Sequence, residues 1–415
     1  MKKILFIVFL LSFSLVSLAQ APQKTTSTTK TTVKAKDKTT PKSKTSTSKT
    51  KDSKAKTKTT KPKEKPPTKE EIKAAEEKKK LEQGCQEANQ NLIQAHKEMD
   101  NKQYYMAEEL LKKALELCPS ETIKYKYELA WNNYLMKEYK KTIQILDTLS
   151  ANEDAPADVY QLLGNAYDEL GNQNMALITY DKGLRKYPNA GCLFLEKGNL
   201  AYKRSNFIGA LEQYENGIEK DPTFSSNYYR AAQIFLSSSE EVWGIMYGEI
   251  FMNLEKGGER AVEISRKLYD CYHSEITFNT NQIRVNFNDP TIVYSNSKER
   301  PNLFPDNYES ALLQACQGQR NITLASLVEI RKRFISNFYR NSPSFKNVLF
   351  DYQKKLIDIG LFEAYNYWLF GYGNTQEAAS WIQNNKAQFD RFVKWQSENP
   401  FPITKDNVFS RYKME

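Results

Sequence analysis

A 34-residue repeat is the feature that most constrains how this chain can fold. The stretches 160–188 and 194–222 align when one is shifted by 34 positions. Residues at the shared positions are Gly164 and Gly198, Ala176 and Ala210, Tyr180 and Tyr214, Gly183 and Gly217, and Pro188 and Pro222. A helical period of this length is typical of a solenoid, in which each unit is one helix pair that buries its apolar face against its neighbours.

The same frame extends to both sides of these two units. One unit begins near residue 86, a second near 123 with Thr142 in place of the small Ala, and a fifth near 225 with Gly244 in that place. Over roughly residues 86–255 the chain resembles the tetratricopeptide repeat (TPR) superfamily. The resemblance implies antiparallel helix pairs with a concave face lined by the first helix of each pair.

The rest of the chain completes a mainly α fold. Thr68 and Glu71 have the spacing of a capping box and predict a charged helix over 69–83. A capping helix over 259–272 closes the array, which we assign to residues 68–272. Alternating apolar residues predict a β-hairpin with its linker over 273–300, with the turn at 279–281. Residues 301–415 are expected to form a helical domain, whose last long helix begins at Asn374 and continues to Pro400.

The N-terminal residues indicate export. Lys2 and Lys3 precede an apolar run over 4–16, and small residues at 17–19 complete a signal peptide over 1–19. The apolar run is too short to span a membrane, and no later run is long enough. We therefore expect an exported protein without a transmembrane segment, in the periplasm or cell envelope.

The positive charge of the chain is confined to its N-terminal tail. Residues 21–70 hold 16 lysines against four acidic residues, whereas residues 71–415 carry a net charge of −4. The Lys/Thr/Ser-rich linker over 20–67 has too little apolar content to fold, so we expect a disordered spacer. It contains no aromatic residues for base stacking, and we expect no nucleic-acid partner. An alternative role is contact with an anionic envelope polymer.

Five cysteines follow the signal segment, and an exported chain permits disulfides. Cys85 precedes the first repeat helix and Cys118 ends its partner, and these two ends meet in an antiparallel helix pair. We therefore expect a disulfide between them, with two separate buried thiols as the alternative.

No catalytic constellation is visible in the sequence. The chain has only two histidines, His96 and His273, and no metal-ligand or phosphate-loop spacing. We therefore expect neither an enzyme nor a cofactor or metal. Glu249 stands in an apolar stretch, where it is expected to reach solvent or to pair with Arg230 or Lys256.

The resemblance to TPR proteins also implies which residues line the concave face. Asn165 and Asn199 occupy one frame position, where some TPR proteins use an asparagine to bind the backbone of an extended peptide. The candidate binding residues are Gln161, Asn165, Asp168, Asn199, Tyr202, Lys203, Tyr229 and Arg230. The alternative is that these residues are only the polar face of a solenoid.

These observations favour an exported TPR scaffold that mediates protein–protein interaction in a bacterial cell envelope by holding a peptide or loop in its groove. A second hypothesis is a peptidoglycan- or glycan-associated factor that uses the basic tail or the aromatic-rich C-terminal domain. A third is an enzyme within that domain.

Overall fold

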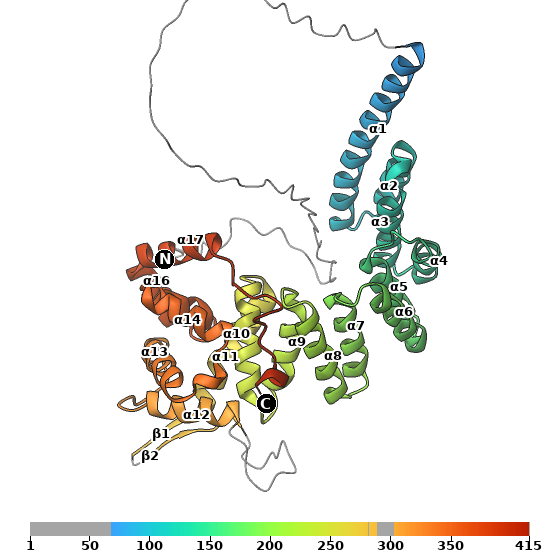
Figure 1. Cartoon of the computed structure of the whole chain (residues 1–415). Coiled ribbons are helices and arrows are strands. Elements are labelled where there is room, and N and C mark those ends of the chain that lie inside the picture. Colours follow the sequence, from blue (N-terminus) through green and yellow to red (C-terminus); the bar gives the residue numbers. More distant parts are fainter. Residues whose placement is uncertain (1–67, 281, 289–302, 415) are drawn as a thin grey trace, which may run out of the picture. The chain divides into compact units, whose positions relative to one another are not determined.

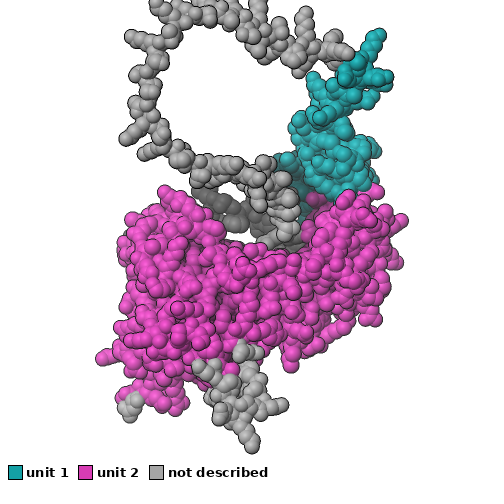
Figure 2. Space-filling view, viewed as in Figure 1, with its two compact units in different colours: residues 1–125 teal, residues 126–415 magenta. Residues whose placement is uncertain are grey.

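The computed structural model describes residues 68–280, 282–288 and 303–414. The predicted signal peptide and the Lys-rich linker over 20–67 lie outside these residues, as does most of the linker that follows the hairpin. The chain divides into two compact units, residues 1–125 and residues 126–415, which Figure 2 colours teal and magenta. We call them the N-terminal and C-terminal units.

The described part of the N-terminal unit is mainly one helix pair, α1 (Lys69–Asp100) and α2 (Tyr104–Leu117), followed by a short 3₁₀ turn (Pro119–Glu121). Thr68 and Glu71 form the expected capping box. The prediction of a separate helix over 69–83 is wrong, because α1 continues without a break into the first repeat helix. Gly84 does not end it: a Cβ there would lie 2.6 Å from the carbonyl oxygen of Leu117, so this glycine permits close packing on the end of α2.

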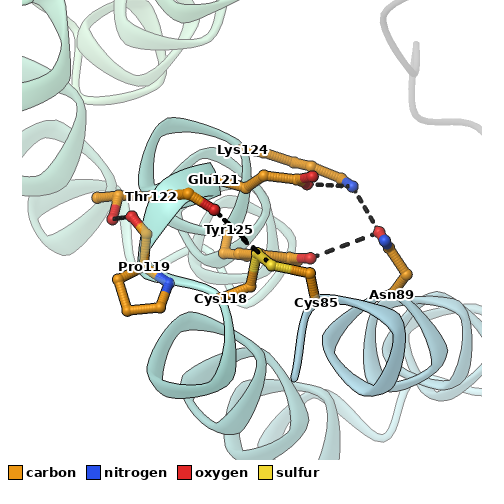
Figure 3. The surroundings of a disulfide bond; sticks show 9 residues. Cys85, Asn89, Cys118, Pro119, Glu121, Thr122, Lys124 and Tyr125 are labelled. Atoms are coloured by element: carbon orange, nitrogen blue, oxygen red, sulfur yellow. Dashed lines mark hydrogen bonds and ion pairs between the residues drawn. A yellow bond between two sulfur atoms is a disulfide. The ribbon is translucent and has the colours of Figure 1, made fainter. Parts of the chain in front are cut away.

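The close packing at Gly84 brings together the two cysteines of this unit. Cys85 and Cys118 form a disulfide with their Cα atoms 4.7 Å apart. Figure 3 shows Cys85 of α1 meeting Cys118 just after α2, with Asn89 accepting hydrogen bonds from Lys124 and Tyr125 beside them. The other three cysteines, Cys192, Cys271 and Cys316, are free.

The repeat array continues through the C-terminal unit as successive helix pairs. The helices are α3 (Thr122–Leu135, which begins before the unit boundary), α4 (Tyr139–Ser150), α5 (Ala157–Glu169), α6 (Gln173–Lys186), α7 (Gly191–Lys203), α8 (Phe207–Lys220), α9 (Ser225–Phe235), α10 (Glu241–Leu254) and the capping helix α11 (Glu259–Glu275). Figure 1 shows α5 to α10 following one another in order. The first helices of successive pairs are neighbours: α5 lies beside α7, α7 beside α9, and α9 beside α11.

An identical turn joins the two helices of each of the first four pairs. Its central residue has a positive φ of 61° at Lys102, 62° at Lys137, 77° at Gly171 and 57° at Ser205. In each turn the backbone N–H of this residue donates to the carbonyl three residues earlier. Only one of the four is glycine, although the left-handed region favours it. The backbone therefore follows the TPR-like frame even in the second repeat, where the sequence pattern is weak.

Size compensation between paired helices explains why the repeats differ in sequence. A Cβ at Gly164 would overlap the ring of Tyr180, and one at Gly198 would overlap the ring of Tyr214. In the second repeat the same two frame positions hold Ala130 and Leu146, both fully buried. A glycine on the first helix is thus paired with a tyrosine on the second, and an alanine with the smaller leucine. Either combination keeps the two helices close-packed.

Gly198→Ala is expected to destabilise the C-terminal unit by about 1–3 kcal/mol, because the added methyl group overpacks the site against Tyr214. Combining it with Tyr214→Leu, the pair found in repeat two, should cost less than the sum of the two single substitutions. Urea denaturation followed by tryptophan fluorescence measures this, since all five tryptophans lie in the C-terminal unit. Strict additivity of the two costs would contradict the size-compensation argument.

Helix α10 is the centre of the C-terminal unit. Every residue from 242 to 253 is buried, because repeat helix α9 covers one side and helices C-terminal to the array cover the other. Trp243 packs against Phe304 and Phe409. One hydrophobic core consequently runs from the fourth repeat to the end of the chain. This double burial is the physical reason for the bulky, unpatterned sequence of the fifth pair.

Following α11, the predicted hairpin is confirmed. Strand β1 (Ile276–Asn279) pairs antiparallel with β2 (Gln282–Val285). The C-terminal helices are α12 (Phe304–Ala315), α13 (Leu324–Asn341), α14 (Val348–Asp358), α15 (Phe362–Phe370), α16 (Thr375–Asn384) and α17 (Lys386–Glu398), with 3₁₀ turns at Pro343–Phe345 and Arg411–Lys413.

The last long helix predicted from Asn374 to Pro400 is interrupted. Asn374 caps its start as expected, by accepting from the backbone N–H of Glu377. At Asn385, however, the side chain donates back to the carbonyl of Trp381, and the backbone leaves the helical conformation. Asparagine competes with the helix for backbone partners in this way, so α16 ends and α17 begins there.

Glu249 on α10 is buried and ion-paired. Its partner is Arg331 of α13, whose Nη2 lies 2.5 and 2.6 Å from the two carboxylate oxygens, and both side chains are 2% exposed. Gln353 and Tyr365 donate to the same carboxylate at 2.7 Å. The prediction of solvent exposure or pairing with Arg230 or Lys256 is therefore wrong, because helices far along the chain enclose this position.

Candidate binding face

All of the predicted binding residues lie on α5, α7 and α9, which together with α3 are the inner helices of the C-terminal unit. We call their shared surface the inner-helix face. It holds Gln161, Asn165 and Asp168 from α5, Asn199, Tyr202 and Lys203 from α7, and Tyr229 and Arg230 from α9. The contacts of these side chains divide them into three groups.

The first group is built around a carboxylate that sequence analysis missed. Glu196 is 6% exposed and accepts from Gln161 Nε2 at 2.8 Å and from Asn199 Nδ2 at 2.9 Å. It has no cation partner among the described residues. The repeat frame could have identified Glu196 from the sequence, because Glu196 and Arg230 are charged residues at the same position of successive inner helices.

The matched asparagines each bind a tyrosine of their own helix pair. Tyr180 donates to Asn165 Oδ1 at 2.6 Å, and Tyr214 donates to Asn199 Oδ1 at 3.0 Å. These are the tyrosines for which Gly164 and Gly198 make room. The repetition of asparagine at this frame position thus has a cause inside the repeat, namely satisfying a buried phenol hydroxyl.

The second group lies nearer the turns. Lys203 of α7 forms an ion pair with Asp168 of α5, which links two neighbouring repeats. Tyr202 is 47% exposed and packs edge-on against Phe207 at the start of α8. Its aromatic surface remains available to a ligand.

The third group joins α9 to α11. Tyr229 donates to Glu263 at 2.7 Å, while Gln233 bridges Glu263 to Arg230. Burial by itself would raise the pKa of Glu263, but the hydrogen bonds from Tyr229 and Gln233 and the nearby charges of Lys267 and Arg230 together hold the pKa below its usual value. Glu263 is therefore ionised and steadies this end of the inner-helix face.

Two aromatic residues of α3 extend the face and were also missed. Trp131 and Tyr134 stack with their ring centroids 5.7 Å apart, and both are half-buried. Burial raises the pKa of the Tyr134 hydroxyl, as do the nearby charges of Glu169, Glu196 and Asp168. Trp131 has the same frame position in its repeat as Asn165 has in the next, so the repeat frame places it on the inner surface.

A separate cleft of about 750 Å³ lies among the C-terminal helices. It is lined by side chains of mixed chemistry, among them Trp395, Tyr352, Lys346, Lys355, Lys413, Asp351, Glu398 and Asp406. Lys355 lies over the ring of Trp395, and Tyr339 donates to Asp351. The cleft shares no residue with the inner-helix face.

Within the described residues, no group of histidine, cysteine, aspartate and glutamate side chains is arranged to hold a metal ion. In the same part of the chain, no helix has both the length and the apolar character needed to cross a bilayer.

Comparison with solved structures finds TPR proteins among those similar to this chain. No protein-family model and no curated protein matches the chain. Solved structures similar to it include a thermophilic TPR protein of Thermus thermophilus, with 17% identity and a TM-score of 0.37 over 44% of this chain and 98% of that one. MamA protein has 15% identity and a TM-score of 0.31 over 41% and 92%.

A third similar structure is YrrB, described as a TPR protein with an unusual peptide-binding site, with 19% identity and a TM-score of 0.28 over 46% of this chain and 95% of that one. Because all three TM-scores are below 0.5, the similarity by itself assigns no ligand or partner to this chain.

Proposed function

We propose that this protein is an exported interaction scaffold of the cell envelope, whose inner-helix face holds a peptide or loop of another protein. Among the described residues, no group of side chains on this face is arranged to hold a metal ion. The face offers instead a row of amide, charged and aromatic side chains on neighbouring helices.

The observation that carries the proposal is hydrogen-bonding capacity that the fold leaves unused. Gln161 Oε1 and Arg230 Nε are buried, and neither has a hydrogen-bond partner among the described residues. Buried polar atoms without partners cost free energy, and a bound segment can relieve that cost. An extended peptide presents an N–H and a C=O at each residue, so it carries both kinds of partner that these two atoms lack.

Two features support export. Residues 1–19 have the composition of a signal peptide. In addition, the Cys85–Cys118 disulfide is of a kind that persists in oxidising compartments.

Photo-crosslinking in the producing cells tests the scaffold proposal. With Tyr202 replaced by benzoyl-phenylalanine, we expect covalent adducts with another protein. Trp131→Ala should reduce their yield at least tenfold, because a half-buried aromatic residue is a typical interface hot spot. The matched controls are the probe at Ile178, an exposed position on α6, and Trp395→Ala in the separate cleft.

An adduct yield that depends on Trp395 and not on Trp131 would contradict the proposal and favour the cleft as the binding site. Equal yields from probes at Tyr202 and Ile178 would also contradict it, because they would show no preference for the inner-helix face.

A further inference from the structure

The cleft of about 750 Å³ among the C-terminal helices has the composition of a small-molecule site. Such sites usually occupy about 300–1,000 Å³ and combine an apolar surface with a few polar groups. The apolar surface here consists of Val348, Tyr352 and Val408, which are buried, and Trp395, which is half-buried. We call these four residues the apolar floor.

Trp395 of α17 gives the cleft an aromatic platform whose ring is held in place. Tyr352 of α14 packs against it with the ring centroids 5.8 Å apart, and Phe401 meets Tyr352 edge-on at 5.2 Å. The Lys355 ammonium lies 5.4 Å from the centroid of the Trp395 ring. Because Trp395 is only half-buried, part of its surface remains available to a ligand.

The chain that follows α17 forms another wall of the cleft, and it is fixed at two points. Asn407 donates to the carbonyl of Pro402 at 2.9 Å, which closes a short loop. Further along, Arg411 forms an ion pair with Glu215 of α8, with Nη2 and Oε2 2.9 Å apart. The fold therefore shapes this wall before any ligand arrives, and a preformed site loses little conformational freedom on binding.

The charged side chains that line the cleft balance one another. All six are exposed: Lys346, Lys355, Lys413, Asp351, Glu398 and Asp406. We call them the charged rim. Within the described residues, none of the six takes part in an ion pair. Their formal charges cancel, so the cleft exerts no net attraction on a strongly charged ligand, while its ammonium and carboxylate groups remain available as donors and acceptors.

A sugar matches this combination of an aromatic platform and a charged rim without net charge. Each hydroxyl group can both donate and accept, so one ring can accept from lysines and donate to carboxylates. Hydrogen bonds to charged groups are also stronger than those between neutral groups. The C–H groups on one side of a sugar ring form an apolar surface that packs on an aromatic ring. A peptide end, by contrast, offers one charge of each sign to a rim that presents three of each.

We propose that this cleft is a second binding site of the protein, separate from the inner-helix face, and that it takes a neutral oligosaccharide with one sugar ring packed on Trp395. The Lys355 ammonium, beside that ring, donates to one of its hydroxyl groups. The C-terminal helices thereby have a role of their own, since they hold a glycan while the inner-helix face holds a protein segment.

A glycan microarray probed with the full chain tests the proposal. We expect retention of neutral oligosaccharides that changes less than twofold between about 0.15 M and 0.5 M NaCl, because the ligand carries no charge to be screened. For the neutral glycan that is retained most strongly, isothermal titration calorimetry should show at least a tenfold loss of affinity in Trp395→Ala. Trp131→Ala, on the inner-helix face, should leave the affinity unchanged.

A second variant avoids the packing that Trp395→Ala removes. Lys413→Gln combined with Glu398→Gln takes one charge of each sign from the charged rim, so the net charge of the protein stays the same. We expect at least a threefold loss of affinity, because two charge-assisted hydrogen bonds are weakened. The matched control is Lys354→Gln with Asp358→Asn, an exposed ion pair on α14 outside the cleft, which should have no effect.

Retention of acidic glycans alone, or of no glycan, would overturn the proposal. It would also be overturned if Trp395→Ala and the rim variant both bound the glycan as tightly as the unmodified protein. If no glycan is retained and the photo-crosslinked adducts depend on Trp395, the cleft takes a protein segment instead. Adducts that depend on Trp131 alone would leave the scaffold function standing whatever the array shows.

Discussion

Arg331→Met is expected to lower the unfolding free energy of the C-terminal unit by about 3–5 kcal/mol. The substitution leaves Glu249 fully enclosed, with hydrogen bonds from Gln353 and Tyr365 but without its cation. An isolated carboxylate in such a site either remains charged at a large desolvation cost or takes up a proton. Urea denaturation at pH 7, followed by tryptophan fluorescence, measures the loss because all tryptophans lie in this unit.

Two variants sharpen the Arg331 experiment. Replacing both partners, Arg331→Met with Glu249→Met, should recover most of the lost free energy, because no unpaired charge is left buried. Lys203→Met, which removes an ion pair whose lysine is 53% exposed, should cost no more than about 1 kcal/mol. A loss below about 1 kcal/mol for Arg331→Met would mean that water reaches Glu249 and that this pair is not enclosed.

The position of Arg331 also marks the limit of sequence-based prediction. The repeat frame, the hairpin and the helix caps at Thr68 and Asn374 depend on residues close together in the chain, and local periodicity predicts them. The partner of Glu249 lies 82 residues away on another element, and no local pattern connects the two. Likewise, the bulky α10 is unpatterned because two layers cover it, and the second layer is encoded by the part of the chain that follows the hairpin.

The sequence predicts which residues lie on the inner helices, but it does not predict the hydrogen bonds that their side chains make. The 34-residue shift locates Gln161, Asn165 and Asn199 on inner helices, where the structure has them. Their hydrogen bonds depend on which neighbour is near, and that is set by packing. Asn165 accepts a hydrogen bond from Tyr180 of its own repeat. The side-chain amide of Gln161 donates instead to Glu196, a residue outside the repeated asparagine position. Examining every inner position of the frame, rather than only the repeated ones, would have included Glu196 and Trp131.

Cys85→Ser is expected to destabilise the helix pair of the N-terminal unit by about 3–4 kcal/mol, the loop-closure value for cysteines 33 residues apart. This loss is large relative to the stability of the N-terminal unit, since a pair of helices buries little apolar surface by itself. Thermal unfolding followed by far-UV circular dichroism, with and without reductant, measures it. The helical signal of α1 and α2 should be lost at a lower temperature in the variant and in the reduced protein.

Tryptophan fluorescence provides the internal control, because the N-terminal unit contains no tryptophan. The unfolding temperature that fluorescence reports for the C-terminal unit should be the same in Cys85→Ser as in the unmodified protein. Reductant should not change it either, since Cys271 and Cys316 are already free and buried. Burial raises the pKa of both thiols, that of Cys316 to about 12, so neither forms the thiolate that would attack the disulfide. If Cys85→Ser shifted both transitions together, the disulfide would be supporting the whole chain and the assignment of its effect to α1 and α2 would be wrong.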